Sequence, residues 1–105
     1  MWSIENERWK QVNVVSILFE IEKDKQSWVF SDIKTMIDSL EKRGYSTDFY
    51  RDRLNENRFM LNYYSENPEE QLVDLLKNEP VVKLFFQKLK SVSERVEVSF
   101  FEKLF

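Results

Sequence analysis

Apolar residues crowd the first quarter of the chain, and the few polar positions among them form a regular series. The series runs in steps of four, three, three, four and four residues: Asn6, Lys10, Asn13, Ser16, Glu20 and Asp24. Such steps place the polar side chains in one narrow stripe along an α-helix. The pattern therefore predicts a helix from Ser3 to Lys23 that lies at the centre of the fold, covered on most of its surface. The alternative is a β-strand, because Ile17, Phe19 and Ile21 occupy alternate positions and β-branched residues favour an extended chain.

Two further helices are expected in the middle of the sequence. The first follows Ser31, a good helix cap, and ends at Gly44, which suits the left-handed residue after a helix. Its apolar residues recur at the spacing of one helical face: Ile33, Met36, Ile37 and Leu40. The second is expected over 48–58. Its asparagines at 55 and 57 compete for backbone hydrogen bonds, so the alternative is a short strand over 58–64.

Two prolines mark the starts of the last two predicted helices. Asn67-Pro68 followed by two glutamates is a strong helix start, and this helix should end before Asn78. Pro80 opens the final helix, which is expected to continue to the end of the chain. One face of it would carry Val82, Phe85, Leu89, Val92, Val96, Phe100 and Leu104. A strand through residues 96–100 is the alternative for its last part.

These elements together predict the fold class. The sequence favours a single all-α domain over residues 1–105, a compact bundle of about five helices around the central N-terminal helix. The alternative is an α+β fold with a short hairpin like that of winged-helix proteins.

The composition limits the chemistry that side chains can perform. Histidine and cysteine are absent, and there is one glycine. The commonest general base, the thiolate ligands of metals and glycine-rich phosphate loops are therefore missing. Ser31 and Lys34 match the serine–x–x–lysine pattern of some acylating enzymes, but a helix cap explains them and the companion motifs are absent. We therefore expect no enzyme, no catalytic residue, no metal site, no cofactor and no small-molecule substrate.

Charge and hydropathy restrict the setting of the protein. The net charge of −3 does not favour broad attachment to nucleic acid or to an anionic membrane. No apolar run is long enough to cross a bilayer, and the N-terminal residues do not resemble a secretory signal. A cytoplasmic protein without a membrane partner is therefore expected.

Basic and aromatic residues interleave between residues 41 and 64. The basic residues are candidates for nucleic-acid binding: Lys42, Arg43, Arg51, Arg53 and Arg58. The segment 33–45 (IKTMIDSLEKRGY) resembles the recognition helix of winged-helix repressors such as the MarR family, and residues 51–53 resemble the wing. The resemblance implies a DNA-binding transcriptional regulator, which is the alternative function.

The C-terminal residues favour a different function. On a helix, Val98, Phe101 and Phe105 would form an apolar face opposite the core-facing residues. A small monomer rarely leaves such a patch in water, so either another helix of the same chain or a partner is expected to cover it. The partner would be another protein or a second copy of the chain. The favoured function is therefore a non-catalytic regulator, adaptor or inhibitor that binds a protein, with a homodimer as one form.

Overall fold

The computed structural model describes residues 13–104. In chain order its elements are β1 (Asn13–Glu20), α2 (Lys23–Lys42), β2 (Thr47–Arg51), β3 (Arg58–Ser65), α3 (Pro68–Asn78), α4 (Pro80–Val92) and β4 (Val96–Glu102). The fold is α+β, so the prediction of an all-α bundle is wrong. No helix among the described residues is long and apolar enough to cross a membrane.

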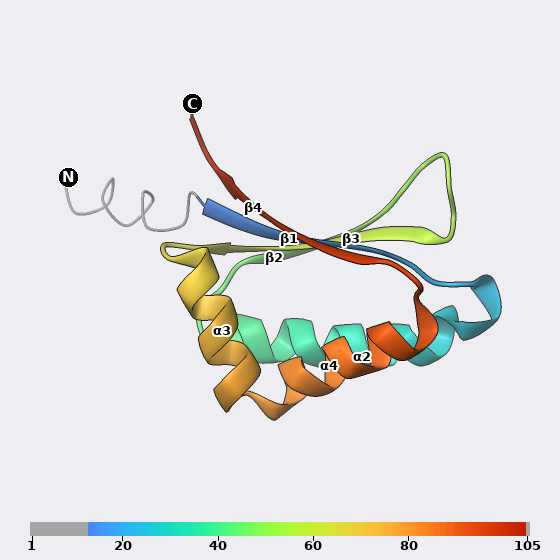
Figure 1. The fold of residues 1–105 in the computed structure, drawn as a ribbon, viewed down its shortest axis with the longest axis horizontal. Coiled ribbons are helices and arrows are strands. Elements are labelled where there is room, and N and C mark those ends of the chain that lie inside the picture. The colour runs from blue at the N-terminus through green and yellow to red at the C-terminus, as the bar shows by residue number, and fades with distance from the viewer. Residues whose placement is uncertain (1–12, 105) are drawn as a thin grey trace.

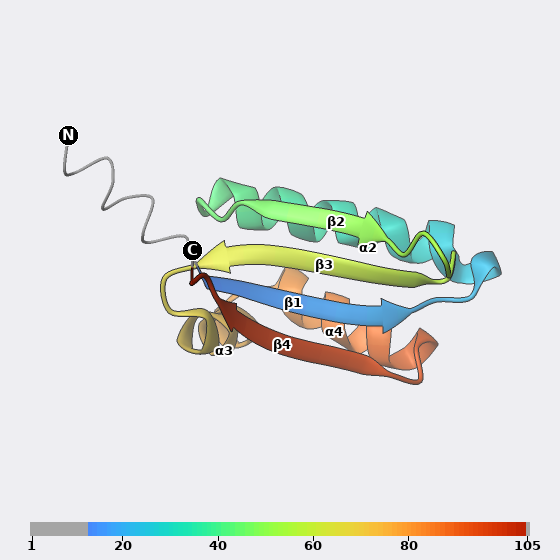
Figure 2. The ribbon, with the colours of Figure 1, turned by 90° about the horizontal axis from the view of Figure 1, so that it is seen from above.

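The four strands form one antiparallel sheet in the order β2-β3-β1-β4. The helices α2, α3 and α4 lie on the same side of it, as Figure 1 shows. Figure 2 looks onto the other side, where no helix of residues 13–104 covers the strands. The molecule therefore has two layers, with a helix-covered face and an open face on the sheet.

Strand β1 occupies the position that the sequence assigned to a central helix. It pairs with β3 on one side and with β4 on the other. Val15, Ile17 and Phe19 point towards the helices and are almost completely buried. The prediction of a helix was wrong because it assumed that the polar residues of this stretch face water. Ser16 is only 5% exposed, and its hydroxyl donates a hydrogen bond of 2.7 Å to Asn62 Oδ1 on the neighbouring strand β3. Residues 3–12 of that predicted helix lie outside the described residues.

Aromatic rings fill the space between the sheet and the helices. Phe19 stacks against Phe49 and Phe59, and the edge of Phe85 from α4 meets the Phe19 ring. Phe30 from α2 contacts the Phe49 and Phe59 rings edge to face. This cluster joins three strands to two helices, and it contains five of the nine phenylalanines in the sequence.

Local signals at helix ends were more dependable than long patterns. Helix α3 begins at Pro68 and α4 begins at Pro80, as predicted. Gly44 has a φ of 90° and follows α2, also as predicted. Helix α2, however, starts at Lys23, eight residues before Ser31. Its first turns bury Gln26 and Val29.

Two predicted helices are partly strands. The helix expected over 48–58 is replaced by β2 and a turn, and the alternative strand over 58–64 is present as β3. The final helix ends at Val92, where Ser93 adopts extended dihedral angles, and β4 follows. Since 47–51 is a strand of the main sheet, the element directly after Gly44 is a strand and not a second helix. Residues 33–64 therefore form neither a helix-turn-helix nor a winged-helix hairpin.

Ile17 tests the central role of β1. Ile17→Ala should lower the free energy of unfolding by about 2–5 kcal/mol, because its side chain has 0% exposure at the middle of the core. Leu54→Ala is the control, since Leu54 is 98% exposed and its loss should change stability by less than about 0.5 kcal/mol. Urea unfolding of both variants measures the difference. An equal loss of unfolding free energy in the two variants would contradict the burial of Ile17 between the sheet and the helices.

Candidate functional site

The open face of the sheet is built in rows, because directly paired residues on antiparallel strands point to the same side. One row is polar across all four strands: Asp48, Asn62, Ser16 and Ser99. The Tyr64 hydroxyl donates a hydrogen bond to Asp48 Oδ2 at 2.9 Å. That bond raises the pKa of Tyr64. The polar groups at the middle of this face thus satisfy one another across strands.

Apolar residues flank the polar row on both sides. On one side Val14 of β1 lies between Tyr64 of β3 and Phe101 of β4. On the other side the neighbours are Leu18 and Met60, followed by Tyr50 on β2. Phe101 is 55% exposed and Tyr50 is 47% exposed. The open face therefore carries partly exposed apolar side chains on both sides of its polar row, at positions where a soluble sheet usually carries polar side chains.

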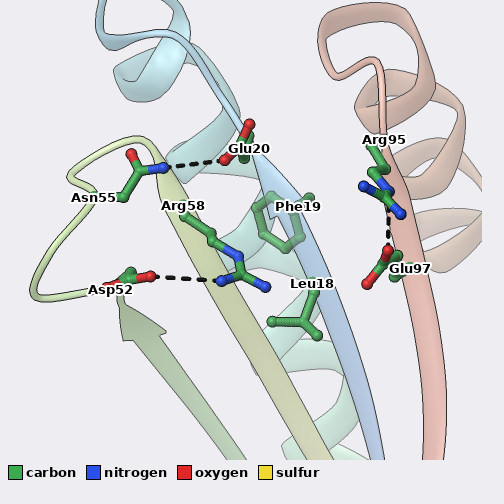
Figure 3. A pocket seen from close by; sticks show the side chains of 8 residues that line it. All are labelled: Leu18, Phe19, Glu20, Asp52, Asn55, Arg58, Arg95 and Glu97. Atoms are coloured by element: carbon green, nitrogen blue, oxygen red, sulfur yellow. Dashed lines mark hydrogen bonds and ion pairs between the residues drawn. The ribbon is translucent and has the colours of Figure 1, made fainter.

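A pocket of about 370 Å³ lies at one end of the open face. We call it the open-face pocket, and its lining residues are Leu18, Phe19, Glu20, Asp52, Asn55, Arg58, Arg95 and Glu97. Figure 3 shows that they come from β1, β3, β4 and the turn between β2 and β3. No single stretch of sequence contains this set.

The charges of the open-face pocket are paired within it. Arg58 Nη1 lies 3.7 Å from Asp52 Oδ2, and Arg95 Nε lies 2.9 Å from Glu97 Oε1. The Asn55 amide donates to Glu20 Oε1 at 3.0 Å (Figure 3). The Arg58–Asp52 contact is long, and about half of the Arg58 side chain is exposed. This guanidinium can therefore turn towards an anionic ligand while the apolar Leu18 side chain contacts the rest of it.

The basic residues proposed for nucleic-acid binding do not form one surface. Lys42 is the last residue of α2 and Arg43 follows it, at the end of the sheet where β2 begins. Arg51, Arg53 and Arg58 lie at the other end of β2. Arg43 forms an ion pair with Glu79. The Arg51 guanidinium lies 5.3 Å from the centroid of the Phe59 ring and 5.9 Å from that of Phe30, and donates a hydrogen bond to Gln26.

The residues proposed for protein binding are also separated. Val98 faces the helix side of the sheet, because it pairs with the inward-pointing Ile17, and it is 36% exposed. Phe101 pairs with Val14 on the open face. Phe105 lies outside the described residues. Helical spacing had placed these three on one face, but on a strand neighbouring positions alternate.

The residues that the sequence missed lie on β1, β2 and β3. Leu18, Met60 and Tyr50 were not candidates, because each looked like an ordinary core residue. Residues 58–65 form the strand β3, in which every second side chain is buried. That alternation indicates a strand with two different faces.

No protein-family model and no curated protein matches the sequence. Solved structures do share its fold. One is a conserved protein from Methanosarcina mazei Go1, with a TM-score of 0.79 and 15% identity, covering 94% of this chain and 99% of that one. A protein from Deinococcus radiodurans, provisionally named an antibiotic biosynthesis monooxygenase, has a TM-score of 0.73 and 10% identity, with coverage of 89% and 93%. Another, named antibiotic biosynthesis monooxygenase, has a TM-score of 0.70 and 10% identity, with coverage of 88% and 98%.

These neighbours share a ferredoxin-like fold with this chain and correct one expectation. The prediction that the protein is not an enzyme is contradicted, because proteins of this fold are named monooxygenases. It rested on the absence of histidine and cysteine, which does not exclude chemistry by other side chains. None of the three names indicates a regulator, an inhibitor or a DNA-binding protein.

The contribution of Arg51 to stability can be tested by comparing its substitution with that of Arg53. Arg51→Ala should lower the free energy of unfolding by about 0.5–1 kcal/mol, because it removes a cation–π contact at the edge of the aromatic cluster. Arg53→Ala removes the same charge from the exposed turn and should have little effect. Thermal or urea unfolding compares the two variants. Equal stability would mean that the Arg51 contacts contribute nothing.

Proposed function

We propose that the protein binds a small organic molecule in the open-face pocket and that a second copy of the chain covers the open face. As in the sequence analysis, the proposed binding surface is apolar and includes Phe101. It now lies on the open face of the sheet and not on one face of a C-terminal helix. The proposal replaces an unidentified partner with a homodimer.

The observation that carries the proposal is the uncovered apolar character of the open face. Val14, Leu18 and Met60 lie on central strands, where their side chains remain only partly buried. Water contact with so much apolar surface is unfavourable, and monomers rarely retain patches of this kind. A second identical sheet offers a self-complementary cover, because a two-fold axis brings the same surface of both chains together.

The chemistry of the open-face pocket supports a small anionic ligand with an apolar part. Arg58 and Arg95 supply cationic hydrogen-bond donors, and Leu18 supplies apolar contact. A covering sheet would exclude water from the pocket and thereby strengthen the charged contacts. The names of the structural neighbours agree with small-molecule chemistry on this fold.

Oxygenation of the bound molecule is a second candidate function. It is favoured by the two neighbours that are named monooxygenases. Glu20, Asp52 and Glu97 provide carboxylates beside the ligand position, where one of them can accept a proton from the substrate.

The dimer is tested by the mass of the protein in solution. The chain has a mass of 12.9 kDa, and we expect twice that value by light scattering. Leu18→Arg should give a monomer, because it places a charge among the apolar residues of the open face, on the central strand β1. Leu84→Arg is the matched control, since Leu84 is 63% exposed on α4 and away from the sheet. A folded Leu18→Arg variant that remains dimeric would exclude this interface.

The ligand class is tested with a panel of hydroxylated aromatic carboxylic acids. Calorimetry should detect binding to the unaltered protein, and Arg58→Ala should weaken it by about tenfold or more, as loss of a charge-assisted hydrogen bond predicts. Arg53→Ala is the control, because it removes an arginine from the same turn but not from the pocket. Equal affinity for the two variants would place the ligand elsewhere. Oxygen uptake with any ligand that binds tests the second candidate, and no uptake across the panel would argue against it.

A further inference from the structure

Gln26 is a buried polar residue near the start of α2 that does not line the open-face pocket. Its side chain is 7% exposed. Its Oε1 accepts a hydrogen bond from Arg51 Nη2 at 3.2 Å, which fixes the orientation of the amide. Its Nε2 donates to Ile21 O at 2.9 Å, to Glu56 O at 3.2 Å and to Asn57 Oδ1 at 3.1 Å. One amide thus joins α2 to the link after β1 and to the turn between β2 and β3.

A chain of hydrogen bonds leads from Gln26 through this turn into the open-face pocket. Its first bond is the one from Gln26 to the side chain of Asn57. The backbone N–H of Asn57 donates to Asn55 Oδ1 at 3.0 Å. Asn55 Nδ2 in turn donates to Glu20 Oε1 at 3.0 Å, at the wall of the pocket (Figure 3). The amide of Asn55 is therefore held at both of its polar atoms.

The bond from Asn55 matters because Glu20 has an alternative partner. Glu20 on β1 is directly opposite Arg58 on β3, so its carboxylate is within reach of the guanidinium. Within residues 13–104, however, the ion pair of Arg58 is with Asp52, and Glu20 forms none. If Asn55 released it, the Glu20 carboxylate would compete with an anionic ligand for Arg58.

The bond between Asn55 and Glu20 depends on the position of the turn. Both residues are exposed, so water competes for their polar groups and both side chains lose conformational freedom when they pair. An Asn55 that is already fixed loses less freedom on pairing. The buried contacts of Gln26 supply this fixed position.

We propose that Gln26 is a positioning residue of the open-face pocket. Through Asn57 and Asn55 it keeps the Glu20 carboxylate from pairing with Arg58, and so leaves the guanidinium available to an anionic ligand. The effect on the ligand rests on the function proposed above, whereas the position of Asn55 does not. The two parts are therefore tested separately.

The position of Asn55 can be followed by NMR without a ligand. Its side-chain NH2 signals report the bond to Glu20, and Glu20→Ala shows where they lie when that bond is lost. Gln26→Met removes the donors of a side chain of similar length, so it should shift the Asn55 signals towards those of Glu20→Ala. Met36→Ala is the control. It creates a cavity in the same helix about 15 Å further along and should leave the Asn55 signals in place.

Asn57→Ala tests the same connection without altering α2. It removes the acceptor that links Gln26 to the turn, while the backbone N–H that Asn55 accepts from remains. The Asn55 signals should shift in the same direction as in Gln26→Met. Because Asn57 is only partly buried, this variant should fold even if Gln26→Met does not.

Calorimetry tests the consequence for the ligand. The probe is the hydroxylated aromatic carboxylic acid that binds the unaltered protein most tightly. Gln26→Met should weaken its binding about threefold or more, and Met36→Ala should not. Adding Glu20→Gln to Gln26→Met should restore the affinity, because a neutral side chain does not compete for Arg58. A general loss of stability would not be rescued in this way.

Three results would overturn the proposal. The first is unchanged Asn55 signals in both Gln26→Met and Asn57→Ala, and the second is an equal shift in Met36→Ala. The third is weaker binding in Gln26→Met that Glu20→Gln does not restore. If no acid of the panel binds the unaltered protein, the proposed ligand class is wrong, and the Asn55 signals still decide whether Gln26 positions the turn.

Discussion

The pairing of β1 with two neighbours is the constraint on which the rest of the structure depends. It connects the β2–β3 hairpin to β4, because β4 has no other partner in the sheet. The same strand supplies Val15, Ile17 and Phe19 to the helix side. Without this strand the helices would lose the apolar surface that Val15, Ile17 and Phe19 provide, and the aromatic cluster around Phe19 could not form.

The placement of all helices on one side has a chemical consequence for the other side. Alternate residues of β1 point away from the helices, and the helix layer cannot reach them. Ser16 and Asn62 satisfy their polar groups across the strands, while Leu18 and Met60 remain partly exposed. The open face thus combines a fixed polar row with apolar surface that has no cover among the described residues. This combination favours a binding function over a purely structural one.

The sequence predicted correctly those features of the fold that depend on neighbouring residues, and it failed for those that depend on residues far away in the chain. Pro68, Pro80 and Gly44 each act within a few residues, and they marked helix ends correctly. The structure of 13–20 depends on partners about forty and eighty residues away, so its polar positions imitated a helical stripe. The same reason explains β4: Val96, Val98 and Phe100 continued the apolar spacing of α4, and only Ser93 interrupts it.

The candidate site was less predictable than the fold, because a row on the open face takes one residue from each strand. Glu20 and Arg58 come together through the register of β1 and β3, and Asn55 reaches Glu20 from a turn. Each of these positions can change without disturbing the residues that face the helices. Structures at 10–15% identity can therefore keep the same fold while their open faces carry different chemistry. For this reason the ligand must be inferred from the pocket's own side chains, and the fold limits only where that pocket can lie.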